Sequence, residues 1–108
     1  MIEQNWSKKE KAIAKRAFEN AYEKECKDLI EKIQKRASEA KGPPDIWRLR
    51  DFLTKRIKEI ENKYDYRYSM LILVFARLMQ EGWLTVDEIE GLDEVKITKI
   101  RYLAEKLI

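Results

Sequence analysis

Apolar residues in the first part of the chain recur every three or four positions, which places them on one side of an α-helix. The pattern Ser7-Lys8-Lys9-Glu10 is a capping box that starts a helix there, and Gly42-Pro43-Pro44 stops it. We therefore predict one helix from about residue 8 to about residue 41. Its apolar stripe comprises Ile13, Ala17, Phe18, Ala21, Tyr22, Cys26, Leu29, Ile30, Ile33, Ala37 and Ala40.

A helix of this length exceeds the size of the domain that one chain can build. About 34 residues rising 1.5 Å each span roughly 50 Å, whereas a compact chain of this length has a diameter of roughly 34 Å. The apolar stripe therefore extends beyond the chain's own core. A second copy packed antiparallel about a two-fold axis would cover it, so we predict a homodimer.

A second helix is predicted from about Asp45, which follows the two prolines and can either cap the helix or occupy its first turn. The reversal at Gly42 lays it back along the first helix, so that the two form a hairpin with facing apolar sides. Two such hairpins would make a four-helix core. The apolar stripe of this helix is Ile46, Leu49, Phe52, Leu53, Ile57, Ile60 and Tyr64, and the residues that we predict in the dimer interface are Leu29, Ile33, Ile46, Leu49 and Leu53.

The last third of the chain predicts three short helices. The segment from Met70 to Met79 has almost no polar face, which is typical of a helix buried on all sides. Thr85 and Glu88 form a second capping box, and Asp93 can cap a final helix with the stripe Val95, Ile97, Ile100, Leu103 and Leu107. The predicted fold is all-α, with a dimerising stem over residues 1–63 and a small helical head over residues 64–108.

Composition limits the chemistry that this chain can perform. Its 108 residues include one Cys and no His, which removes imidazole bases, His metal ligands and His-activated nucleophiles. Cys26 alone cannot form an internal disulfide. No signal-peptide pattern begins the chain, and the apolar run from Met70 to Ala76 is too short to span a membrane. We therefore expect a cytoplasmic protein without catalytic residues, cofactor, metal or membrane insertion.

Charge argues against a nucleic-acid binder. The first 42 residues carry 11 Lys+Arg and 8 Asp+Glu, of totals of 23 and 20, so the small excess of positive charge lies on the first helix among many acids. Nucleic-acid binders concentrate uncompensated positive charge on one face. Tyr64, Tyr66 and Tyr68 could stack on bases, but no recognised RNA-binding signature surrounds them, and we predict no nucleic-acid partner.

Two tryptophans are candidates for protein recognition. Trp6 precedes the first capping box. It packs either on a partner subunit or on the other end of its own hairpin, or it serves as an exposed anchor for another protein. Trp47, Arg50, Asp51 and Thr54 share one helix face, and an aromatic beside charged groups is typical of binding surfaces. The alternative is an Asp51–Lys55 pair beside a Trp47 half-buried in the hairpin.

Several segments together resemble the fluorescence recovery protein family of cyanobacteria. They are Trp6-Ser7, Ala21-Tyr22, Ile46-Trp47-Arg48-Leu49-Arg50-Asp51-Phe52-Leu53, Lys63-Tyr64-Asp65-Tyr66-Arg67, Val74-Phe75-Ala76, Glu81-Gly82 and Lys99-Ile100. The resemblance extends from Trp6 to about Leu103, and the run from Trp47 to Phe75 is its most specific part.

The resemblance implies an all-helical protein that dimerises through an extended stem. It also implies a non-enzymatic regulator that binds the light-activated red form of the orange carotenoid protein, speeds its return to the orange form and helps to detach it from the phycobilisome. The residues that we predict for this partner surface are Trp6, Trp47, Arg50, Asp51, Phe52 and Lys99.

The chain departs from the family pattern at three positions. Arg50 stands where the family has a His, Ile57 where it has an Arg, and Leu73 where it has a Phe; Arg56 is adjacent to Ile57 but on a different helix face. Losing a guanidinium removes a charge-assisted contact of about 1.5 to 3 kcal/mol. Related proteins also occur in bacteria without phycobilisomes, so a second hypothesis is a dimeric interaction module for a different, unknown protein.

Overall fold

The computed structural model describes residues 5–107 and contains four α-helices, one 3-10 helix and no β-strand in that range. The helices are α1 (Lys8–Glu39), α2 (Pro43–Lys63), α3 (Leu71–Gln80) and α4 (Glu94–Lys106), with η1 (Val86–Ile89) between the last two. The all-α prediction is confirmed. No helix within residues 5–107 is both long and apolar enough to cross a membrane.

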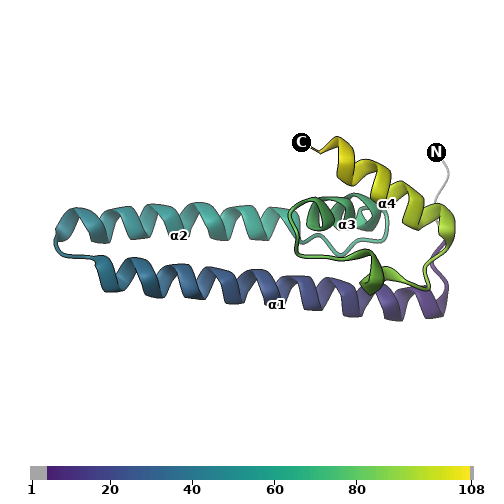
Figure 1. Cartoon of the computed structure of the whole chain (residues 1–108), viewed down its shortest axis with the longest axis horizontal. Helices are drawn as coiled ribbons and strands as arrows, with labels where there is room; N and C mark the ends of the chain where they lie inside the picture. The colour runs from purple at the N-terminus through teal and green to yellow at the C-terminus, as the bar shows by residue number, and fades with distance from the viewer. Residues whose placement is uncertain (1–4, 108) are drawn as a thin grey trace.

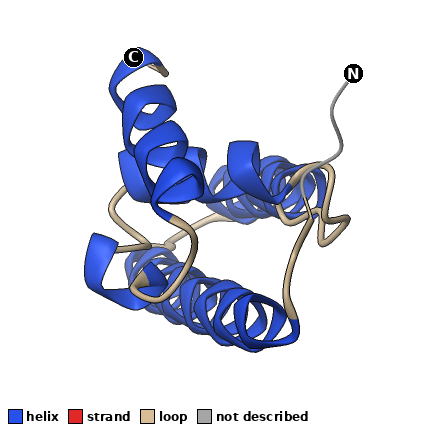
Figure 2. Ribbon diagram, turned by 90° about the vertical axis from the view of Figure 1, so that its right-hand side faces the viewer, coloured by secondary structure: helices blue, strands red, loops and turns tan. Residues whose placement is uncertain are grey.

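Helices α1 and α2 form the antiparallel hairpin that the sequence predicts, and they give the molecule its length of 53 Å against 24 and 22 Å in the other directions (Figure 1). Helix α2 begins at Pro43, two residues before the predicted start. The reason is that Asp45 caps from within the first turn, where its carboxylate accepts hydrogen bonds from the Lys41 and Gly42 amides at 2.9 and 3.3 Å. Viewed along the stem (Figure 2), the short helices pack to one side of the two long ones.

The short helices α3, η1 and α4 form the head. Both predicted caps are present: Asp93 accepts a hydrogen bond from the Val95 amide, and the Thr85–Glu88 box starts an element that is only one 3-10 turn. Gly91 is required at its position because its φ is +103° and a Cβ would lie 2.6 Å from Ile13 Cδ1 of α1. The connection between η1 and α4 therefore lies directly on the long helix.

The main core lies between the head and the first half of α1. Ala14, Ala17 and Ala21 are fully buried on one line of α1 and let the head approach closely. The side chains that fill this core are Phe75, Leu71, Leu78, Ile89 and Ile100. The core is continuous across the boundary that we predicted after residue 63. The prediction that helix α3 is buried on all sides is wrong. Its residue Leu73 faces away from α1 and is 45% exposed.

A buried carboxylate ties the start of α1 to the start of α4. Glu10 accepts hydrogen bonds from the Ser7 and Asp93 amides at 3.0 and 2.9 Å and from the Lys96 ammonium at 2.9 Å. Burial opposes its ionisation, but the hydrogen bonds from Ser7, Asp93 and Lys96 outweigh burial and lower its pKa to about 2. The sequence predicts the Ser7–Glu10 capping box, whereas Asp93 and Lys96 are contacts that only the fold creates.

A second buried network joins both stem helices to the head. Glu25 of α1 is 1% exposed and binds the Lys63 ammonium at 2.6 Å, the Tyr64 hydroxyl at 2.8 Å and Arg56 at 3.2 Å. Lys63 also binds Glu81 at the end of α3, at 2.6 Å. Burial and the hydrogen bond to Glu25 raise the pKa of Tyr64. The network fixes the head relative to the stem at the point where the main core ends.

The Glu10 carboxylate is expected to make stability depend on pH between about 2 and 4.5. Its pKa is lowered from 4.5 in the unfolded chain, so its contribution is fully present above pH 4.5 and is lost as pH falls toward 2. The free energy of unfolding should fall by up to about 3 kcal/mol from this group. In Glu10→Gln that part of the pH dependence should vanish, as measured by urea unfolding at a series of pH values. Glu19→Gln, on the exposed side of α1, is the control, and an equal loss in all three proteins would contradict the assignment.

Removal of the Glu25 carboxylate is expected to be costly. Glu25→Leu leaves the Lys63 ammonium buried with one carboxylate fewer, and breaking such a pair costs about 3 to 5 kcal/mol. The double variant Glu25→Leu/Lys63→Met should be less destabilised than the single one. Asp28→Asn, which removes an exposed pair with Lys32, should cost less than about 1 kcal/mol. Equal effects of Glu25→Leu and Asp28→Asn in denaturant unfolding would refute this role.

Candidate functional site

The residues that could carry function lie on exposed surfaces. Within residues 5–107 no group of three His, Cys, Asp or Glu side chains is arranged to hold a metal ion. Three surface regions contain most of the side chains that the sequence singles out: the outer side of α2, the outer side of α4 and an apolar side of the stem. Such surfaces suit protein recognition, which draws on exposed aromatics beside charged groups.

The outer side of α2 carries a small mixed surface, the stem patch, made by Trp47, Arg50 and Asp51. Trp47 is 53% exposed, and the Arg50 guanidinium lies 5.5 Å from the centre of its ring. Arg50 also donates two hydrogen bonds of 3.1 Å to Asp51. The alternative Asp51–Lys55 pair is wrong, because the Asp51 carboxylate is bound by Arg50. The patch is therefore an aromatic surface with a preformed charge pair.

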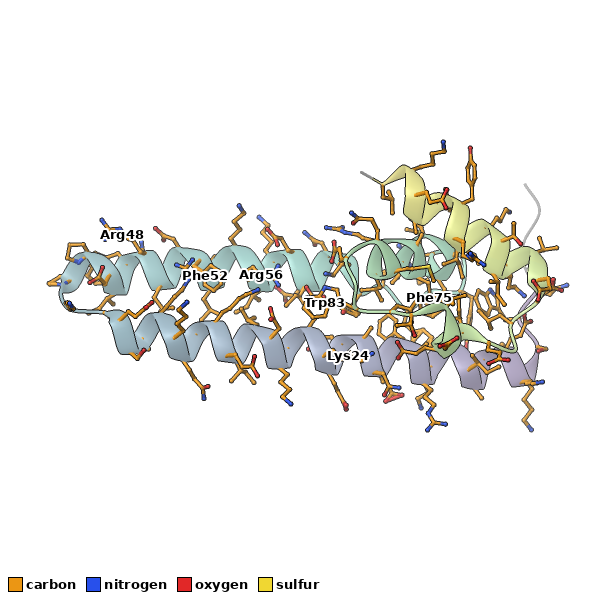
Figure 3. All side chains as sticks on the ribbon, viewed as in Figure 1. Lys24, Arg48, Phe52, Arg56, Phe75 and Trp83 are labelled. Atoms are coloured by element: carbon orange, nitrogen blue, oxygen red, sulfur yellow. The ribbon has the colours of Figure 1, made fainter. Side chains whose placement is uncertain are left out.

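Phe52 does not belong to the stem patch. It points from α2 toward α1 (Figure 3), where the Arg36 guanidinium stacks on its ring at 3.8 Å. Arg56, one turn further along α2, points the same way and binds Glu25 and Glu59. Phe52 therefore lines a groove between the stem helices rather than the surface that carries Trp47.

Trp6 is buried, with 8% of its surface exposed. Its ring packs 5.8 Å from the ring of Tyr68 and 4.7 Å from the Lys96 ammonium, while its Nε1 has no hydrogen-bond partner among the described residues. Trp6 thus packs on its own head, neither on the far end of the hairpin nor exposed as an anchor. The capping box could not reveal this contact, which requires Lys96 of α4.

The tyrosines that raised the question of base stacking pack on other aromatic rings, although Tyr68 remains 39% exposed. Tyr66 stacks on Phe18 with ring centres 4.8 Å apart, and Tyr64 meets Phe18 and Tyr22 edge to face. Tyr68 packs on Trp6 and Tyr66. These rings pack the loop after α2 against α1, and their role is therefore structural.

The outer side of α4 carries a second surface, the head patch, made by Lys99, Val95 and Tyr102. Lys99 was predicted from the sequence, but Val95 was placed on the inner stripe and is in fact 65% exposed. The reason is that Lys96 occupies the buried position on this helix, where its ammonium donates a hydrogen bond to the Glu10 carboxylate. Tyr102 is also largely exposed and was missed; its spacing of three residues from Lys99 could have identified it.

The third region is an apolar side of the stem. Ile30, Ile46 and Ile57 are exposed, with Ile46 at 56%, and the neighbouring Ile33, Leu49 and Leu53 are half-buried. Of the five residues predicted for a dimer interface, Leu29 alone is buried within the chain. The other four keep accessible surface, which a single hairpin leaves in contact with water.

The apolar side and the head lie on different sides of α1. Ala14, Ala17 and Ala21 face the head, and the buried line of α1 continues through Glu25 and Leu29. Tyr22, Cys26 and Ile30 come directly after Ala21, Glu25 and Leu29 in the sequence. One residue corresponds to a rotation of about 100° around a helix. The apolar side is therefore turned away from the head and remains open along the stem.

The positions where we expect the chain to depart from the family pattern are accessible. Ile57 lies on the apolar side of α2, and Leu73 lies on the outer side of α3. Arg56 does not substitute for a guanidinium at position 57, because its side chain points into the groove and is held by Glu25 and Glu59. The surface around Ile57 is therefore apolar.

Comparison with known proteins agrees with this arrangement. The family described as photoprotection regulator fluorescence recovery protein matches residues 6–104. The fluorescence recovery protein of Synechocystis sp. is 39% identical over 99 residues, which cover 92% of this chain and 91% of that protein. The solved structure of the Fremyella diplosiphon protein has 46% identity and a TM-score of 0.91, and that of the Synechocystis protein has 39% and 0.90; each match covers 94% of this chain and 99% of the other. The chain therefore belongs to the fluorescence recovery protein family of photoprotection regulators.

Proposed function

We propose that this protein is a non-enzymatic regulator that binds the light-activated orange carotenoid protein and speeds its return to the orange form. The observation that carries the proposal is the family match over residues 6–104. Trp47, Asp51 and Lys99, which the resemblance implies for the partner surface, are exposed and so are available to a partner. The regulator acts in the cytoplasm and uses no cofactor, and nucleic acid is not its partner.

Such a regulator needs no covalent chemistry. Some regulators bind the transition state between two conformations of a partner more tightly than they bind either conformation. Such a regulator accelerates the interconversion of the two conformations. Two surfaces at a fixed distance suit this task, because a partner that changes shape fits both of them in only part of its cycle. The Glu25–Lys63–Glu81 network holds the stem patch and the head patch in one relative orientation.

We also propose that two chains form the working unit. The exposed Ile30, Ile46 and Ile57 make a stripe along the stem that a second hairpin, packed antiparallel, would cover. The dimer then has a four-helix core, with Ile33, Leu49 and Leu53 in the seam.

A second candidate is a dimeric interaction module for a protein other than the orange carotenoid protein. The observation that favours it is the exposed Ile57, at a position where the resemblance implies a guanidinium. Arg50 and Leu73 are the further departures that the resemblance implies. The two candidates share the fold and the dimer, and differ in which partner fits the stem.

Charge placed in the stem seam is expected to separate the dimer. Ile46→Glu and Leu49→Glu each put a carboxylate into an apolar interface, where an unpaired charge is poorly tolerated. Light scattering coupled to size-exclusion chromatography should give a dimer for the wild type and a monomer for both variants at micromolar concentration. Asn62→Glu makes the same charge change on the exposed surface of α2 and should stay dimeric. A monomeric wild type, or unchanged elution of both seam variants, would contradict the interface.

Mixing with illuminated orange carotenoid protein tests the partner. The wild type should co-elute with it and accelerate the red-to-orange colour recovery. Trp47→Ala should weaken binding tenfold or more, because exposed aromatics commonly dominate such interfaces, whereas Lys58→Ala on the same helix should change it less than twofold. If the wild type neither co-elutes with that protein nor accelerates its recovery, this partner is refuted and the second candidate is favoured.

A further inference from the structure

A groove runs between the two stem helices and ends under the head. Its volume is about 860 Å³, and its lining includes Lys35 and Arg36 of α1, Phe52 and Arg56 of α2, and Arg77 and Trp83 of the head. In Figure 3 Phe52 and Arg56 point into the space between the stem helices, and Trp83 lies at its head end. Neither the stem patch nor the head patch contributes to it.

The groove lies on the side of α1 that faces the head. The head covers the line of Ala14, Ala17 and Ala21, and the same three- and four-residue spacing continues through Glu25 to Lys32 and Lys35 beyond the head's edge. The exposed apolar stripe is rotated about 100° from this line. A second chain on the apolar stripe would therefore leave the groove open.

Most carboxylates in the groove already have partners. Glu25 is bound by Lys63, Tyr64 and Arg56, Glu59 by Arg56, and Glu81 by Lys63 and Arg77. Glu39, near the reversal of the hairpin, is the one lining carboxylate that forms no ion pair among the described residues. The groove thus has few free acceptors.

Several donors in the groove remain free. Among the described residues, neither the Lys35 ammonium nor the Arg36 guanidinium binds a carboxylate, and Arg77 uses only its Nε to bind Glu81. Stacking on Phe52 holds the Arg36 guanidinium at the groove wall. The lining contains six basic and four acidic residues. The groove therefore complements an anionic ligand.

We propose that this groove binds an acidic segment of the partner protein. Carboxylates of the segment pair with Lys35, Arg36 and Arg77, and an apolar side chain packs on Trp83. A peptide fits better than a small anion, because the free donors are spread along an elongated groove that has an aromatic at its end. It also fits better than nucleic acid, because the fixed carboxylates of Glu25, Glu59 and Glu81 would repel closely spaced phosphates.

The proposal deepens the proposed function, and rests on it only in taking the partner to be a protein. A short synthetic peptide of alternating glutamate and leucine tests it directly. Added to the isotope-labelled protein, it should shift the NMR amide signals of Lys35, Arg36 and Trp83, and the glutamine–leucine version of the peptide should not. Shifts confined to the apolar stripe, or equal binding of both peptides, would overturn the proposal.

A charge reversal with a matched control completes the test. Lys35→Glu/Arg36→Glu should weaken peptide binding at least tenfold, and Lys35→Ala/Arg36→Ala should weaken it less but measurably. Lys15→Glu/Arg16→Glu changes the charge equally at another adjacent exposed pair of α1 and should bind like the wild type. Unchanged binding by both groove variants, or a single-stranded RNA that binds the wild type more tightly than the peptide does, would overturn it.

The same variants separate this proposal from the proposed function. If the wild type binds orange carotenoid protein, the Lys35→Glu/Arg36→Glu variant should bind it at least tenfold more weakly, and the Lys15→Glu/Arg16→Glu variant should not. Equal binding by both variants would overturn the groove as its docking site. If the wild type does not bind that protein, the proposed function fails, while the peptide titration still decides whether the groove takes an acidic segment.

Discussion

The length of α1 is the constraint on which the rest of the structure depends. Its 32 residues extend well beyond the head. Only the first half of the helix therefore lies in the main hydrophobic core, where Ala14, Ala17 and Ala21 are buried. Apart from an ion pair between Lys24 and Glu88 of η1, the second half packs on α2, and along it the one buried apolar residue of α1 is Leu29. Apolar area removed from water contributes about 25 cal/mol per Å² to the free energy of folding. In the stem of a single chain Ile30, Ile46 and Ile57 stay exposed and contribute little of this energy. The second chain that we propose would cover this apolar surface.

Buried charges set the shape at the junction of stem and head. Hydrophobic packing alone does not fix one angle between a hairpin and a small bundle, since apolar contacts are non-directional. Lys63 of α2 binds carboxylates from two other parts of the fold, Glu25 of α1 and Glu81 at the end of α3. At the other end of the head, Glu10 of α1 binds Lys96 of α4 and the Asp93 amide. Each charge is costly to bury unless all of its partners are in place. The two networks thus favour one orientation of the head relative to the stem over other orientations.

Local patterns in the sequence predict the fold well and the site only in part. The Ser7–Glu10 and Thr85–Glu88 boxes, Asp93 and the reversal at Gly42 depend on neighbours within a few residues, so helix boundaries and the hairpin could be predicted. The burial of Trp6 and the exposure of Val95 could not, because both follow from the Glu10–Lys96 contact between residues 86 positions apart. Phe52 faces α1, as its place in the apolar stripe predicts, but its stacking with Arg36 of the other helix could not be predicted. Spacing along one helix defines a face, but not which neighbour covers it.

Hydrogen exchange measured at several protein concentrations tests the central claim that a second chain stabilises the stem. If two chains cover the apolar stripe, the amides of Ile30, Ile33, Leu49 and Leu53 should exchange more slowly as the concentration rises through the dissociation range. In that range the amides of Phe75 and Ile100, in the core of the head, should change much less. Equal and concentration-independent protection of stem and head would contradict the account, because the stem of a single chain would then be stable without a partner.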